Sequence, residues 1–170
     1  MERVDAITDY LYLGGIAGVK KDFLLENGIN LIINATMEMP DYDSHGIEKF
    51  RIKIGDMPGA KIDEHFDKVS DLIEGRRQQN QKVFVHCVAG ISRSSTLVLA
   101  YLMKYQNLSL VEAHYLVKSK RKMIRPNNGF WTQLIEYEKK LFGKNTVTMV
   151  PTRLGMMPHI YEAEVRNMIW

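Results

Sequence analysis

Residues 82–105 predict a strand that leads through a short loop directly into a helix, and this unit limits the folds open to the chain. Residues 82–86 read KVFVH, an apolar and β-branched run typical of a strand buried on both faces. Residues 94–105 have the composition of a buried helix. A buried strand that continues into a helix is the usual unit of a parallel sheet, so we expect an α/β fold.

The rest of the chain repeats this alternation of strand-like and helix-like patterns. We expect strands over residues 11–13, 29–35 and 50–54, helices over residues 17–27, 62–79 and 130–142, and a further helix that opens at Ser109. Ser109 and Glu112 form a capping-box pattern at the start of one helix. The sequence therefore predicts a single α/β domain over residues 1–143, with a central, largely parallel sheet flanked by helices.

The last part of the chain has a weaker pattern, and we treat residues 144–170 as a C-terminal extension packed on the domain. Residues 146–150 (TVTMV) are strand-like, and we expect them to join a sheet edge. Tyr161, Ile169 and Trp170 are the apolar side chains expected to anchor the extension.

Composition excludes several classes of protein. Cys87 is the only cysteine, so a disulfide scaffold is excluded and a reducing compartment is favoured. We expect the cytoplasm, with the nucleus as a further compartment. The net charge of +3, from 23 Lys and Arg against 20 Asp and Glu, is too small for bulk nucleic-acid binding.

No targeting or membrane segment is predicted. The first residues, MERVDAITDY, contain no apolar core of a secretory signal, and Glu2 does not fit the myristoylation motif. The longest apolar stretch, TLVLAYLM over residues 96–103, is far shorter than the ~18 residues that span a bilayer.

The loop after the strand at residues 82–86 has the composition of an anion site. Cys87 follows the strand directly, and Arg93 follows after five intervening residues, where the helix begins. Backbone N–H groups gather at such a strand-to-helix loop, Gly90 lets it curl, and a guanidinium binds two phosphate oxygens at once. The same groups favour a thiolate, so Cys87 is a candidate nucleophile rather than an inert buried cysteine.

The segment HCVAGISRS at residues 86–94 resembles the signature of the cysteine-dependent protein phosphatases, and specifically of their dual-specificity branch. LYLGG at residues 11–15 and RPNNGF at residues 125–130 extend the resemblance, which covers roughly residues 4–142. The chain looks like an atypical member, a catalytic domain without a kinase-docking domain before it. Its last residues also look like those of a small subgroup of atypical enzymes.

The resemblance implies a role for each residue of the signature. Cys87 would form a phosphocysteine, Arg93 would bind the phosphate, and Ser92 would donate a hydrogen bond to the thiolate as it leaves. The family uses no metal and no other cofactor. The residues lining the phosphate would be Val88, Ala89, Gly90, Ile91, Ser92 and Arg93, supported from behind by His86, Ser94 and Asn127.

A general acid is also needed, because the alkoxide of a serine or tyrosine is a poor leaving group. The family carries an aspartate about thirty residues before the cysteine, and Asp56 lies on a predicted loop, GDMP, 31 residues before Cys87. An Asx-turn ahead of the proline is the structural alternative for Asp56. Asp63 and Asp67 are competitors, but both fall in a predicted helix.

A run of basic side chains precedes the RPNNGF segment. We expect a solvated helix end, while the alternative is a surface that steers acidic phosphopeptides toward the site. The run comprises Lys118, Lys120, Arg121, Lys122 and Arg125.

The function that the resemblance implies is hydrolysis of phosphotyrosine and of phosphoserine or phosphothreonine in proteins. Its partners would be phosphorylated proteins, including protein kinases of signalling cascades. A non-catalytic phosphoprotein-binding module of the same fold is the main alternative, but inactive relatives usually lose the cysteine that this chain keeps. Phosphoinositide and RNA phosphatases carry different loops, and a sulfurtransferase explains neither Asp56 nor Asn127.

Overall fold

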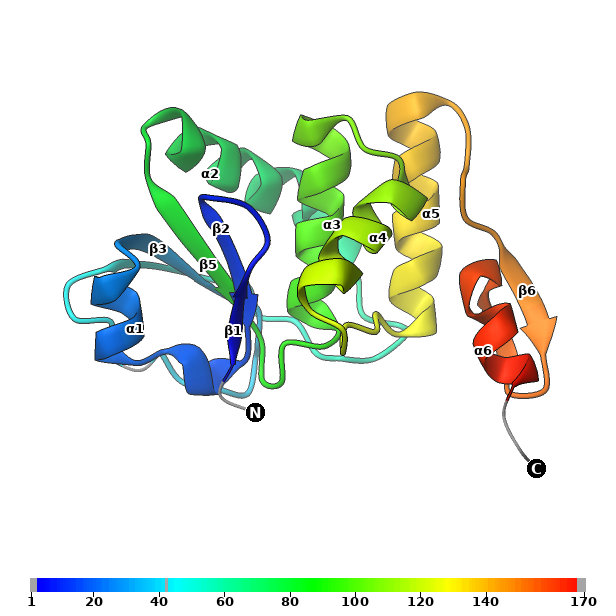
Figure 1. The fold of residues 1–170 in the computed structure, drawn as a ribbon, viewed down its shortest axis with the longest axis horizontal. Helices are drawn as coiled ribbons and strands as arrows, with labels where there is room; N and C mark the ends of the chain where they lie inside the picture. Colours follow the sequence, from blue (N-terminus) through cyan, green and yellow to red (C-terminus); the bar gives the residue numbers. More distant parts are fainter. Residues whose placement is uncertain (1–2, 42, 168–170) are drawn as a thin grey trace.

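The computed structural model describes residues 3–41 and 43–167, and these contain a five-stranded sheet with helices on both faces (Figure 1). The strands lie in the order β1-β2-β5-β3-β4. Only β1 runs antiparallel to its neighbour, so the predicted α/β domain with a largely parallel sheet is confirmed. The strands are β1 (Val4–Ala6), β2 (Leu11–Gly14), β3 (Ile29–Asn34), β4 (Glu48–Arg51) and β5 (Lys82–His86).

The helices divide between the two faces of the sheet. α1 covers one face alone, and the larger helices α2 to α5 cover the other (Figure 1). α4 begins with the expected capping box between Ser109 and Glu112. Within the described residues, no helix is both long and apolar enough to cross a bilayer. The helices are α1 (Lys21–Glu26), α2 (Phe66–Gln78), α3 (Arg93–Gln106), α4 (Leu110–Lys120) and α5 (Asn128–Phe142), with 3₁₀ turns at Ile16–Gly18 and Ile62–His65.

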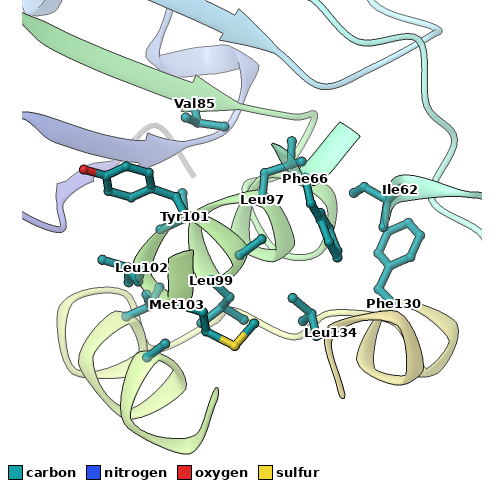
Figure 2. Close-up of a cluster of buried hydrophobic side chains, with 14 of the residues drawn as sticks. Ile62, Phe66, Val85, Leu97, Leu99, Tyr101, Leu102, Met103, Phe130 and Leu134 are labelled. Carbon is teal, nitrogen blue, oxygen red and sulfur yellow. The ribbon is translucent and has the colours of Figure 1, made fainter. Parts of the chain in front are cut away.

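Alternate side chains of β5 enter two separate apolar clusters, so this strand is buried on both faces. Val83 and Val85 join the large cluster, where α3 packs against α2, α4 and α5 (Figure 2). Phe84 points to the opposite face and joins Leu24 of α1. Because β5 lies at the centre of the sheet, the residue that follows its C-terminal end, Cys87, is held in a fixed position.

The strand expected at residues 50–54 lies instead at Glu48–Arg51. The pairing ends when the Ile52 N–H donates to the Asn34 carbonyl oxygen at 2.8 Å, after which the chain leaves the sheet. Ile52 and Ile54 are buried as expected, but beyond the strand. The alternation of these two residues with charged residues therefore reflects their burial, although both lie outside the strand.

The extension forms its own hairpin, so the expectation that residues 146–150 join an edge of the main sheet is wrong. β6 (Met149–Thr152) pairs antiparallel with β7 (Gly155–Pro158), and a short helix α6 (Glu162–Arg166) follows. Tyr161 is buried, and its hydroxyl accepts a hydrogen bond from Trp131 Nε1 at 3.1 Å. Ile169 and Trp170 lie outside the described residues. The division of the chain at residue 143 stays a prediction.

Candidate active site

The loop that joins β5 to α3 lies at the C-terminal edge of the parallel strands, at the lower end of the molecule in Figure 1. We call residues 87–93 the phosphate loop. Ser92 occupies the N-cap position of α3, and Arg93 is its first residue. The loop therefore ends at a helix N-terminus, which carries partial positive charge and free N–H groups.

The carbonyl groups of the phosphate loop point outward, away from its concave side. In a planar trans peptide the N–H points opposite to the carbonyl, so the N–H groups of residues 89–92 face inward. Inward N–H groups make a nest for an anion. The outward carbonyl oxygens of residues 88, 89, 90 and 91 accept from Ile16 N–H (3.0 Å), Arg121 Nη2 (3.0 Å), Arg121 Nε (2.8 Å) and Arg125 N–H (2.8 Å).

Cys87 lies at the base of this nest. Its sulfur accepts a hydrogen bond from the Gly90 N–H at 3.2 Å and lies 3.1 Å from the hydroxyl oxygen of Ser94. Gly90 has a φ of +69°, and a Cβ there would approach the backbone of Gly14 to 2.5 Å, so only glycine fits. The two donors would stabilise negative charge on the sulfur.

The structure corrects the expected contact of Ser92 with the sulfur, because Ser94 makes it. Ser94 stands in the first turn of α3, whose side chains point back toward the helix N-terminus and so toward Cys87. The Ser92 hydroxyl instead accepts the Asn127 N–H at 3.0 Å.

Arg93 is buried and held from outside the phosphate loop. Its Nη1 and Nη2 donate to the two carboxylate oxygens of Glu38 at 2.7 and 2.9 Å, and Nη1 also donates to the Ile54 carbonyl oxygen at 3.0 Å. Its Nε is buried without a hydrogen-bond partner. A buried donor without a partner is costly, so Nε is suited to receive an oxygen of a bound anion.

The charges around Arg93 keep the ion pair in its charged state. The hydrogen bond from Arg93 lowers the pKa of Glu38 to about 2. Burial works against the charge of Arg93, but the hydrogen bond with Glu38 and the charges of Cys87 and Asp56 raise its pKa overall.

Asn127 connects Asp56 to the phosphate loop. Its side-chain NH₂ donates to an Asp56 carboxylate oxygen at 2.9 Å, while its backbone N–H donates to Ser92. Its side-chain oxygen accepts the Phe130 N–H at 2.9 Å and so caps α5. Asp56 is therefore oriented by a residue fixed to both the helix and the nest.

The loop that carries Asp56 also lies directly against α5. A Cβ at Gly129 would lie 1.9 Å from the carbonyl oxygen of Pro58, so only glycine permits this contact. Among the competitors, Asp67 instead accepts hydrogen bonds from Lys104 and Tyr137. Asp56 is therefore the aspartate that the structure connects to the phosphate loop.

His86 lies below the nest and is buried. Its Nδ1 donates to the carbonyl oxygen of Cys87 at 3.1 Å. Burial lowers the pKa of His86 below its usual value, although that hydrogen bond partly opposes the shift. His86 is therefore neutral at pH 7, and it fixes the backbone beside the sulfur rather than supplying positive charge.

Sequence reasoning missed Arg121, which was expected on a solvated helix end. Arg121 is fully buried, and its Nη1 donates to a carboxylate oxygen of Asp5 at 3.0 Å while the rest of the guanidinium holds the phosphate loop. The spacing of four from Ala113 through Val117 places Arg121 on the buried stripe of α4, and this signal was available.

Glu38 and Arg125 also differ from what the sequence indicated. No sequence pattern marked Glu38, which lies in an exposed loop after β3. Arg125, expected at a free basic surface, pairs with Glu164 at 3.2 Å and lies 4.2 Å above the ring of Tyr161. In residues 3–41 and 43–167, no group of three or more His, Cys, Asp or Glu side chains is arranged to hold a metal ion.

The site thus combines a sulfur nucleophile, an anion nest, a guanidinium whose Nε has no hydrogen-bond partner, and a carboxyl group fixed nearby. These groups suit a tetrahedral anion whose ester oxygen needs a proton, which is the chemistry of phosphate-ester hydrolysis.

Comparison with known proteins agrees with this chemistry. The family described as "Dual specificity phosphatase, catalytic domain" matches residues 11–140. The chain is 46% identical to human "Dual specificity protein phosphatase 14" over 164 residues, which covers 96% of this chain and 83% of that protein.

Two solved structures show the same fold. Human DUSP28 superposes with a TM-score of 0.79 at 29% identity, covering 81% of this chain and 94% of that one. A human tyrosine phosphatase-like serine/threonine/tyrosine-interacting protein gives a TM-score of 0.77 at 30% identity, covering 82% and 98%.

Proposed function

The chain belongs to the dual specificity phosphatase family and is a protein phosphatase, and from this premise we propose that it forms a phosphocysteine on Cys87. Its substrates would carry phosphotyrosine, phosphoserine or phosphothreonine. The observation that carries the proposal is the sulfur of Cys87 at the base of the nest, with donors from Gly90 and Ser94.

In the first step, the thiolate of Cys87 attacks the phosphorus atom, and the bond from phosphorus to the ester oxygen breaks. Arg93 Nε and the inward N–H groups bind the non-bridging oxygens. Asp56, in its protonated form, gives its proton to the leaving oxygen, which departs as an alcohol or phenol. Arg93 keeps its place because Glu38 holds the far side of the guanidinium.

In the second step, a water molecule attacks the phosphocysteine. The Asp56 carboxylate takes a proton from this water, and the bond from sulfur to phosphorus breaks to give inorganic phosphate. The Ser94 hydroxyl donates to the sulfur as it becomes a thiolate again. Asp56 is then protonated and Cys87 is a thiolate, as at the start of the cycle.

The alternative of a non-catalytic phosphoprotein-binding module shares this fold, so the fold does not decide between them. The catalytic-domain match and the curated relatives named phosphatases favour the enzyme. A binding module also has no need of an aspartate fixed beside the nest, which Asp56 is.

Substrate range provides the test of the proposed function. Val88 and Ile91 are exposed on the phosphate loop, and no KNRY segment is present to build a deep tyrosine pocket. We expect measurable kcat/KM on matched phosphotyrosine and phosphothreonine peptides of otherwise identical sequence. Turnover of phosphotyrosine peptides alone would contradict dual specificity, and turnover of neither would contradict the proposal.

Changing Ser94 to alanine is expected to slow hydrolysis of the phosphocysteine about 10- to 100-fold, because a hydrogen bond to a charged group is worth ~1.5–3 kcal/mol. Rapid-quench kinetics should then show a burst of released phenol followed by a slow steady state. Ser92→Ala is the matched control, since the Ser92 hydroxyl accepts the Asn127 N–H, while the hydroxyl that contacts the sulfur is that of Ser94. A burst in the Ser92 variant alone would return the role to Ser92.

Protein kinases of signalling cascades, in the cytoplasm or nucleus, are the substrates that we propose. Capture of phosphorylated proteins from a lysate by the Cys87→Ser variant, followed by mass spectrometry, would identify them.

A further inference from the structure

Exposed apolar side chains gather around the candidate active site. Among the described residues, eight large hydrophobic side chains are exposed. Four of these stand on the three loops that form the site: Met37 beside Glu38, Met57 beside Asp56, and Val88 and Ile91 on the phosphate loop. Single exposed apolar residues are common, but a group of them around a reactive sulfur indicates a binding surface. We call these four residues the apolar rim.

The two methionines of the rim both lie against Gly55. A Cβ built on Gly55 would lie 3.1 Å from Met57 Cε and 3.4 Å from Met37 Sδ, so both thioether ends border the same position. Gly55 follows Ile54, whose carbonyl oxygen accepts from Arg93. The residue that both methionines contact is therefore the neighbour of Ile54, which binds the Arg93 guanidinium. Met37 and Met57 are nevertheless each 58% exposed.

Two cationic groups near the site are already engaged. Arg121 is buried against Asp5, and Arg125 is paired with Glu164. The Glu38 carboxylate instead follows Met37 in the same loop, and the Glu38 side chain is 49% exposed. An acidic side chain that lay on Met37 would therefore meet like charge.

We propose that the site selects phosphorylated protein segments whose residues next to the phosphorylated residue are apolar, and that these residues pack on the apolar rim. This inference rests on the proposed function, because the rim is continuous with the site that binds the phosphate. Methionine suits such a surface because its flexible thioether adapts to different apolar partners. The acidic phosphopeptide that the basic run would suggest is the competing substrate.

The experiment measures kcat/KM for three phosphotyrosine peptides with leucine, serine or glutamate at the flanking positions. In the unmodified enzyme, we expect the leucine peptide to exceed the serine peptide by about tenfold, and the glutamate peptide to be the poorest. The double variant Met37→Gln/Met57→Gln keeps two unbranched side chains but makes their ends polar. It should bring the leucine-to-serine ratio close to 1.

Leu25→Gln is the matched control, because Leu25 is an exposed apolar residue of α1, is 53% exposed and lies outside the rim. This variant should keep the leucine-to-serine ratio of the unmodified enzyme. Circular dichroism of both variants would show that each is folded. A preference for the glutamate peptide, or an unchanged ratio in the double variant, would overturn the inference.

Two further measurements distinguish a failure of the apolar rim from a failure of the proposed function, and a peptide substrate from a lipid substrate. Cys87→Ser must abolish turnover of all three peptides, and residual turnover would refute the proposed function itself. If Cys87 is required for turnover but the unmodified enzyme shows a leucine-to-serine ratio close to 1, the proposed function stands and only the role of the apolar rim is refuted. Vesicles that contain a phosphorylated phosphatidylinositol provide the other arm, and a double variant that loses lipid turnover but keeps its peptide ratio would assign the rim to a membrane.

Discussion

Replacing Cys87 by serine is expected to reduce turnover of aryl phosphates and phosphopeptides by more than about 10⁴-fold, as loss of the nucleophile does in other covalent enzymes. A serine hydroxyl is a weak nucleophile without a base, and the groups that contact the sulfur of Cys87 are the Gly90 N–H and the Ser94 hydroxyl, neither of which is a base. The nest is also held from outside by Arg121, and Arg93 is held by Glu38, so neither is positioned by the sulfur alone. Binding of a phosphate analogue, measured by calorimetry, should therefore survive within about tenfold.

Two outcomes would contradict this expectation in different ways. Appreciable turnover by pure Cys87→Ser enzyme would exclude the phosphocysteine. Loss of analogue binding together with activity would mean that the variant has lost the nest, and Cys87→Ala would then test whether the added hydroxyl is responsible.

Replacing Asp56 by asparagine is expected to slow hydrolysis of phosphotyrosine and phosphothreonine peptides by roughly 10²–10⁴-fold, the usual contribution of a positioned general acid. Asparagine keeps an oxygen that can accept from Asn127, so the loop stays in place while the proton is lost. An activated aryl phosphate, whose leaving group needs no proton, should lose far less. The measurement compares kcat on both substrate types.

Asp63→Asn is the matched control, because Asp63 is an acidic residue of the following 3₁₀ turn. It should change neither rate by more than about twofold. An equal loss on both substrate types in Asp56→Asn would show that Asp56 supports the loop rather than supplying the proton.

Local patterns predicted the fold because its strands and helices alternate along the chain. The run at Lys82–His86 was predicted at its observed bounds, and Cys87, Gly90 and Arg93 follow it within seven residues. Their approach to one another needs no long-range information. Asp56 was located by spacing to the cysteine, and the structure connects it to the phosphate loop through Asn127.

Contacts between distant segments were not predictable in the same way. Glu38 reaches Arg93 across 55 residues, and Asp5 reaches Arg121 across 116. Neither acidic residue lies in a patterned element: Glu38 is in a loop, and Asp5 is in a three-residue strand too short to show a period. Ser94 rather than the predicted Ser92 contacts the sulfur, because the directions of the two side chains at the start of α3 decide which one reaches it. Sequence spacing alone does not reveal these directions.

The contact between Gly129 and the Pro58 carbonyl oxygen has a consequence for inherited variation. Every amino-acid change at a glycine codon adds a Cβ, and at position 129 that atom would lie 1.9 Å from a backbone oxygen of the loop carrying Asp56. The loop is exposed and the helix is anchored in the core, so the loop would yield. A missense allele at this codon would therefore encode a phosphatase that retains Cys87, Arg93 and its core. It would lack a correctly placed Asp56 to protonate the leaving alcohol or phenol.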